Sequence, residues 1–175
     1  MVRVYIPATL AMLQRLVADQ SMHALSGTAF AVTPTLRESY AEGDDDELAE
    51  VALREAALAS LRLLAAEEAS GGDPGDDTEG LPLRRAVLVA DVEGATIRPD
   101  LDDAVVRLAG PVAVGDVVAA YIDNAAAEPA VKAAMAVVDL ADFGDEDAEL
   151  TVGDAQDHDL AWYATQELPF LLELL

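Results

Sequence analysis

The chain has 175 residues, with 34 Asp and Glu, ten Lys and Arg, two His and no Cys, which gives a formal net charge of −24. This length predicts one domain, and an apolar share of 53% indicates a globular fold rather than disorder. The lack of cysteine excludes disulfide scaffolds, thiol nucleophiles and thiolate metal sites, while the negative charge disfavours direct binding to nucleic acids and anionic membranes.

The first part of the chain predicts two strands, each followed by a helix. Residues 2–7 alternate apolar and polar side chains, which is typical of a strand. The Thr9 hydroxyl can cap a helix that runs to residue 19, because Leu side chains recur there at helical spacing. Residues 28–33 predict a second strand, and Thr33 followed by Pro34 predicts a short helix that ends near residue 40.

A long helix over residues 46–69 is the largest predicted element. Its apolar side chains lie around much of its circumference, so we expect neighbours on more than one side. Residues 70–82 (SGGDPGDDTEGLP) have the composition of a flexible acidic loop. This loop is the best internal boundary of the chain.

The second part of the chain predicts strands at residues 85–92, 105–108 and 117–123. The first of these is a nearly continuous apolar run, which predicts a central strand buried on both faces. A helix follows Asn124, and residues 139–159 form an acidic stretch without Lys or Arg, which is typical of a solvated face. The last helix is expected to end before Pro169.

These elements predict a fold of the α/β (α+β) class. We expect a single globular domain over residues 1–175 with a mixed sheet of four or five strands. Helices are expected to cover this sheet, and the long helix is expected to be central.

The basic residues are candidates for binding a small anion, because a guanidinium group binds a carboxylate or phosphate through two parallel hydrogen bonds. Asp91 and Asp123, the acids most expected to be partly buried, could act beside these arginines as a general acid or base. The alternative is that the arginines balance local acids and that each acid caps a helix or pairs with an arginine. The candidate ligand-binding residues are Arg3, Arg37, Arg85, Arg107, Asp91 and Asp123.

A weak candidate for a divalent metal site lies in the acidic stretch, because hard cations take clustered oxygen ligands. Its spacing differs from that of calcium-binding loops, and the alternative is a solvated acidic loop. The candidate ligands are Asp142, Asp145, Asp147 and Glu149.

No catalytic group of residues is recognisable in the chain. The only histidines are His23 and His158, no G-x-S-x-G turn surrounds a serine, and no glycine-rich phosphate loop occurs. We therefore expect no cofactor, and we favour a protein that is not an enzyme.

The C-terminal residues are rich in large apolar side chains. An exposed patch of this kind would bind a partner or form a homodimer, whereas the alternative is that it closes the core. The interface candidates are Trp162, Phe170, Leu171 and Leu175.

Four segments together resemble an actinobacterial family of uncharacterised cytoplasmic proteins of about this length. They are VRVYIPATLAML at 2–13, TAFAVTPTLRE at 28–38, VRLAGPVA at 106–113 and DHDLAWYATQELP at 157–169. The resemblance extends over essentially the whole chain. It implies no activity, cofactor or catalytic residue.

The function that the sequence favours is that of a non-enzymatic binding or regulatory protein. Its acidic surface would dock on a basic protein partner. No run of about 18 apolar residues and no signal-peptide pattern occurs, so we expect a cytoplasmic protein. The alternatives are a small-anion binder or unrecognised enzyme that uses arginines with Asp91 or Asp123, and a mimic of nucleic acid.

Overall fold

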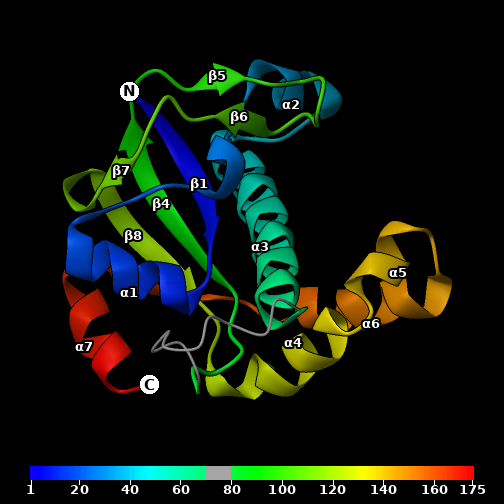
Figure 1. Ribbon diagram of the computed structural model, residues 1–175. Helices are drawn as coiled ribbons and strands as arrows, with labels where there is room; N and C mark the ends of the chain where they lie inside the picture. The colour runs from blue at the N-terminus through cyan, green and yellow to red at the C-terminus, as the bar shows by residue number, and fades with distance from the viewer. Residues whose placement is uncertain (70–79) are drawn as a thin grey trace.

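The computed structural model describes residues 1–69 and 80–175, and it places a seven-stranded sheet at the centre of the fold (Figure 1). The strand order is β5-β6-β3-β1-β4-β8-β9, and all neighbouring strands are antiparallel. A separate two-stranded sheet pairs β2 (Ser21–Met22) with β7 (Val112–Ala113). The strands of the large sheet are β1 (Val2–Ala8), β3 (Thr28–Phe30), β4 (Ala86–Val92), β5 (Thr96–Ile97), β6 (Val105–Arg107), β8 (Val117–Ile122) and β9 (Ala161–Ala164).

The predicted α/β class and the long helix are confirmed, but the sheet is larger than predicted and is not mixed. It has seven antiparallel strands instead of four or five. The additional strands are short ones such as β5 and β9, which carry too few residues for a periodic pattern. The connection from β1 to β3 contains a helix, yet it leaves β1 and enters β3 at the same end of the strands. These neighbouring strands are therefore antiparallel.

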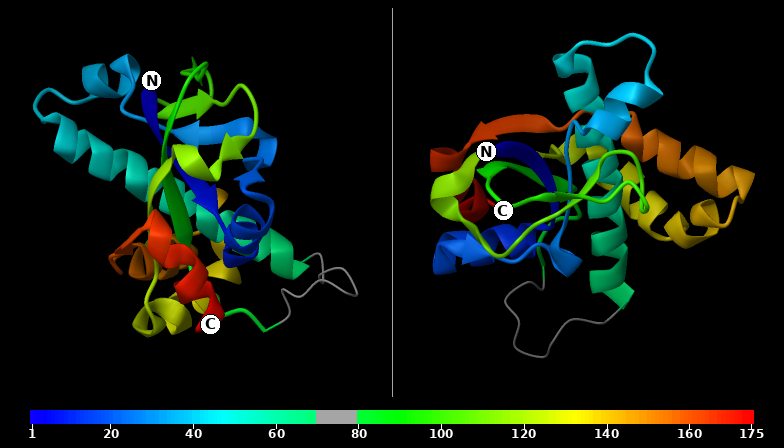
Figure 2. Two further views of the ribbon diagram at one scale, coloured as in Figure 1. Left: turned by 90° about the vertical axis from the view of Figure 1, so that its left-hand side faces the viewer. Right: turned by 90° about the horizontal axis from the view of Figure 1, so that it is seen from above.

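Strand β4 is buried on both faces, as its apolar sequence predicts. Ala86, Leu88 and Ala90 face a core shared with α1 (Leu10–Asp19) and α7 (Leu168–Glu173). Val87 and Val89 face the opposite core, where α2 (Pro34–Ser39) and α3 (Asp45–Ala69) pack. Figures 1 and 2 show the resulting layers, with α3 on one side of the sheet and α1 with α7 on the other.

A third apolar cluster lies beyond α3 and holds the helices of the acidic part of the chain. It joins Leu61 and Leu64 of α3 to Val131 and Val152 from the segment that follows β8. The helices of that segment are α4 (Glu128–Met135), α5 (Val138–Asp142) and α6 (Glu146–Gln156). The acidic stretch at residues 139–159 is therefore mostly helical, and Figure 1 shows α5 and α6 beyond α3, away from the sheet.

Both predicted threonine caps are confirmed. The Thr9 hydroxyl accepts a hydrogen bond from the Met12 backbone N–H at 3.3 Å, and Thr33 accepts one from Leu36 at 3.0 Å. Pro34 occupies the first turn of α2, where its missing N–H is not needed. Each cap depends on a hydrogen bond between residues three apart in the chain, so the sequence pattern alone was sufficient to predict both caps.

The C-terminal segment differs from the prediction of a helix that ends before Pro169. Residues 161–164 form edge strand β9, which pairs with β8, and Pro169 lies in the first turn of α7. Proline is favoured in a first turn for the same reason that it is excluded from a helix interior. Of the predicted 70–82 loop, residues 70–79 lie outside the described residues, and residues 81 and 82 belong to no helix or strand.

Ser60 connects α3 to the central strands. It is fully buried, its hydroxyl donates to the Ala8 carbonyl at 2.6 Å, and it accepts from the Ala86 backbone N–H at 2.9 Å. Ala8 and Ala86 are directly opposite each other in the β1–β4 pair. One hydroxyl therefore forms hydrogen bonds with backbone groups of both strands at the end of the β1–β4 pairing.

Within the described ranges, no helix is both long and apolar enough to cross a bilayer.

We expect Ser60→Ala to lower the free energy of unfolding by about 1–3 kcal/mol, because it leaves a buried N–H without its acceptor. Ser39→Ala is the matched control, since the Ser39 hydroxyl bonds at an exposed position. This control should change stability by about 0.5 kcal/mol or less. Urea unfolding of the three proteins measures the effect, and equal losses for both variants would contradict it.

Candidate functional site

The most unusual polar feature of the fold is a fully buried ion pair between Arg85 and Asp123. Arg85 precedes β4 and Asp123 follows β8, and the register of these strands places the two residues side by side. Their side chains are 1% and 0% exposed. Two parallel hydrogen bonds join them, from Nε to Oδ2 at 2.8 Å and from Nη2 to Oδ1 at 2.7 Å. The Arg85 backbone N–H also donates to Oδ2 at 2.8 Å.

The rest of the Arg85 guanidinium group binds the end of α6. Nη1 donates to Gln156 Oε1 at 2.9 Å, and Nη2 donates to the His158 carbonyl at 2.9 Å. Gln156 in turn donates from Nε2 to the Arg54 carbonyl on α3 at 3.2 Å. Arg85 therefore connects two strands, the end of α6 and α3. All but one of its N–H donors are engaged in these contacts.

A cavity of about 500 Å³ adjoins this ion pair between α3 and residues 156–160. Arg85 and Gln156 contribute to its lining, together with His158. Apolar side chains and carboxylates complete it. The full lining is Glu47, Glu50, Val51, Leu53, Arg54, Ala57, Arg85, Gln156, His158, Asp159 and Leu160.

The other candidate ligand-binding residues do not join this cavity. Arg3 and Asp91 lie opposite each other on β1 and β4 and form two hydrogen bonds, of 3.0 and 3.1 Å. The hydrogen bond from Arg3 lowers the pKa of the Asp91 carboxyl below its ordinary value. Arg37 forms an ion pair with Asp45, and the Arg107 side chain is exposed on β6. The structure therefore brings four of the six predicted residues together, as the pairs Arg3–Asp91 and Arg85–Asp123, and does not gather the arginines in one cleft.

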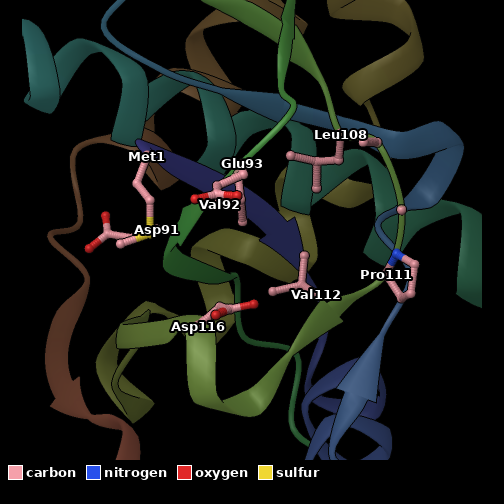
Figure 3. Close-up of a pocket in the computed structure, with 10 residues that line it drawn as sticks. Met1, Asp91, Val92, Glu93, Leu108, Pro111, Val112 and Asp116 are labelled. Carbon is pink, nitrogen blue, oxygen red and sulfur yellow. The ribbon is translucent and has the colours of Figure 1, made fainter.

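Asp91 lines a second cavity, of about 300 Å³, at the opposite end of β4 from Arg85 (Figure 3). The charged side chains in its lining are the carboxylates of Asp91, Glu93 and Asp116. Leu108, Pro111 and Val112 supply much of its apolar surface. Because carboxylates repel anions, this cavity does not suit a small-anion ligand.

Two of the four candidate metal ligands, Asp142 and Asp145, have other partners in the structure. Asp142 accepts hydrogen bonds from Arg62 of α3 at 2.8 and 3.0 Å, and Asp145 caps α6 by accepting from the Ala148 N–H at 2.9 Å. Asp147 and Glu149 follow in the first turn of α6. In the part of the chain that the structure describes, no three His, Asp or Glu side chains are arranged to hold a metal ion.

The same segment carries an exposed apolar surface that the sequence analysis missed. We call residues 138–156 the acidic hairpin, because α5 and α6 join there through Phe143 and Gly144. Phe143 is 91% exposed and Leu150 is 70% exposed. Leu150 lies on the side of α6 opposite the buried Ala148 and Val152. The hairpin carries no Lys or Arg, and its acids are Asp139, Asp142, Asp145, Glu146, Asp147, Glu149 and Asp154.

The C-terminal interface candidates divide between core and surface. Leu171 and Leu175 pack against the core that α1 and α7 share, beside the buried Leu168 and Leu172. Phe170 points outward from α7, and Trp162 is exposed on edge strand β9. Helical spacing accounts for this division within α7, because residues 168, 171 and 172 lie on one side of the helix and residue 170 on the other.

Asp123→Asn tests the buried ion pair. We expect it to lower the free energy of unfolding by about 3–5 kcal/mol, because Arg85 would remain buried without a counter-charge. The control Asp91→Asn breaks an exposed pair and should cost about 1 kcal/mol or less. Chemical unfolding measures both values, and similar losses in the two variants would contradict the structural role of the buried pair.

Asp142→Asn tests how the acidic hairpin is held to α3. The hydrogen bond from Arg62 lowers the pKa of Asp142 in the folded protein. The pair therefore makes its full contribution to the free energy of unfolding at pH values above the ordinary carboxyl pKa. This stability is lost as the pH falls through the lowered folded-state pKa. Because both side chains are partly exposed, we expect the variant to lose about 1 kcal/mol or less at neutral pH.

The difference between wild type and Asp142→Asn should therefore close in acid, which urea unfolding over a series of pH values measures. Asp154→Asn, on an exposed position of α6, is the control and should show no such loss. A difference that persists at the acidic end would show that Arg62 does not act on the Asp142 carboxylate.

Comparison with known proteins supports the part of the resemblance that concerns an uncharacterised family. Neither the search of curated proteins nor the search of solved structures found a match. Residues 2–172 match the sequence model of one family, which is described as a family of unknown function, DUF6912. Because this match covers nearly the whole chain, the protein belongs to the DUF6912 family.

Proposed function

We propose that this protein is a non-enzymatic binding protein that docks a basic protein partner through the acidic hairpin. The observation that carries the proposal is the near-complete exposure of Phe143, together with Leu150, on a segment with seven carboxylates and no Lys or Arg. Large apolar side chains exposed on a projecting element are typical of protein interaction sites. The carboxylates around them select a partner of positive charge.

The two kinds of side chain have different physical roles in such an interface. Aromatic and large aliphatic side chains contribute most of the binding energy when a partner buries them. The surrounding charges mainly raise the rate of association and exclude partners of the wrong sign. The expected partner therefore presents an apolar pocket for Phe143 with lysine and arginine around it.

The acidic hairpin is held in place before any partner binds. Its inner side chains Val138, Val152 and Ala155 are buried in the cluster with α3 and α4, and Arg62 binds Asp142 at its base. A preorganised surface loses little conformational entropy on binding. This rigidity supports a recognition surface and distinguishes the hairpin from a solvated acidic tail.

A second candidate function, a mimic of nucleic acid, is favoured by one observation. Mimicry needs carboxylates on rigid elements, and Asp139, Asp142, Glu146, Asp147 and Glu149 lie on helices α5 and α6. In that case the basic partner would be a nucleic-acid-binding protein. The exposed Phe143 has no counterpart in a phosphate backbone, so we place this function second.

The remaining expectations draw less support. Of the arginines named as anion ligands, Arg3, Arg37 and Arg85 lie in separate ion pairs, and Arg107 is exposed on β6. For this reason we do not favour a small-anion binder or an enzyme. A homodimer through Trp162 and Phe170 and a cytoplasmic location stay predictions.

A photo-crosslinking amino acid at position 143 tests the proposed function in host lysate. The matched control carries the same amino acid at Leu101, an exposed apolar position between β5 and β6. We expect position 143, but not position 101, to capture a protein of basic isoelectric point, and we expect capture to fall at about 0.5 M salt, where charge attraction is screened. Phe143→Ala should then weaken binding of the purified partner about tenfold or more.

Capture that is equal at both positions, or that does not depend on salt, would contradict the proposal. Adding duplex DNA separates the two candidate functions. Displacement of the captured partner by DNA would favour mimicry, whereas capture that DNA leaves unchanged would favour a partner of another class.

A further inference from the structure

The cavity beside the buried ion pair has the features of a binding site of its own. Its walls come from α3 and from residues 156–160, and the half-buried Val51, Leu53 and Leu160 face it with apolar groups. Neither Phe143 nor Leu150 of the acidic hairpin lines it. Its volume of about 500 Å³ is within the range of small-molecule sites.

Hydrogen-bond donors line the inner part of this cavity. Arg85 is 1% exposed, and one N–H of its Nη1 has no acceptor among the described residues after the bonds to Asp123, Gln156 and His158 are counted. Gln156 uses one amide N–H for the Arg54 carbonyl and retains the other. Because Asp123 already balances the charge of Arg85, these donors suit a neutral oxygen acceptor better than a second carboxylate.

Carboxylates surround the cavity on the solvent side. Glu47, Glu50 and Asp159 are exposed there, and Arg54 is the one exposed cation among the described residues of the lining. Three carboxylates against one guanidinium group leave an excess of negative charge around the opening. This end of the cavity therefore attracts a cation.

We propose that this cavity binds a small organic cation that carries a neutral oxygen acceptor, the chemical class to which amides of basic amino acids belong. The acceptor oxygen reaches the free N–H donors of Arg85 and Gln156. An aliphatic stem packs on Val51, Leu53 and Leu160, in the way that lysine and arginine stems cover apolar surface. The ammonium or guanidinium group lies among Glu47, Glu50 and Asp159. The site shares Gln156 with the acidic hairpin but includes neither Phe143 nor Leu150, and it does not depend on the partner surface proposed above.

Argininamide and agmatine are the matched probes for this site. Both carry a guanidinium group and an amine, and they differ by the carboxamide. At a pH at which both amines are protonated, we expect argininamide to bind about three- to tenfold more tightly, because its carbonyl makes a hydrogen bond that agmatine lacks. Titrations followed by the backbone amide shifts of Val51 and Leu160 measure both affinities and locate the binding.

The variant Glu47→Gln/Glu50→Gln tests the carboxylates around the opening. We expect it to weaken argininamide about two- to fivefold for each carboxylate removed, as is typical of exposed ion pairs. Glu173→Gln, on an exposed position of α7, is the charge-matched control and should leave the affinity unchanged. All three positions are exposed, so the variants should fold like the wild type.

Three outcomes would overturn the proposal. They are equal affinity for the two probes, equal weakening by Glu173→Gln, and shifts that spread over the acidic surface without a maximum at Val51 and Leu160. None of them bears on the crosslinking result at position 143, so the two proposals fail or stand separately.

Discussion

The ion pair between Arg85 and Asp123 is the interaction on which the arrangement of this protein depends. Among the ion pairs between described residues, it is the one whose two side chains are both buried. A charge in the interior must be paired and hydrogen-bonded, because burial without a partner costs several kcal/mol. This requirement determines how β4 and β8 meet and where the end of α6 lies. Arg85 also lines the larger cavity, so the same contact contributes to its shape.

Helix α6 connects the two candidate sites. The helix belongs to the acidic hairpin, with Leu150 facing outward, and its last residue, Gln156, bonds to Arg85 beside the cavity. Among the described residues of α3, Arg62 is the one that forms an ion pair with the hairpin. With a net charge of −24, most carboxylates of this chain have no cation to balance them. Their repulsion is tolerated because they stay in water, where charges interact weakly.

Several residues of the buried site could be named from the sequence, but their arrangement could not. Arg85 and Asp123 stand at the ends of predicted strands, and that position marked them as candidates. That they bond to each other follows from the antiparallel pairing of β4 with β8, which no local pattern encodes. Gln156 carried no signal at all, because a single amide in a polar run resembles any surface residue. The exposure of Phe143 had one available signal, an aromatic residue in an acidic segment beside Gly144.

The sequence by itself determined the α/β class, the two-sided burial of β4, the threonine caps of α1 and α2, and the long helix α3. Each of these depends on hydrophobic periodicity or on hydrogen bonds within a few residues, which neighbouring side chains specify. Tertiary structure alone decided the number and direction of the strands, the edge strand β9, and the helices of the acidic hairpin. These depend on contacts between residues far apart in the chain. Residues 161–164 become a strand because β8 offers an open edge, and α6 is held by apolar side chains from α3 and α4.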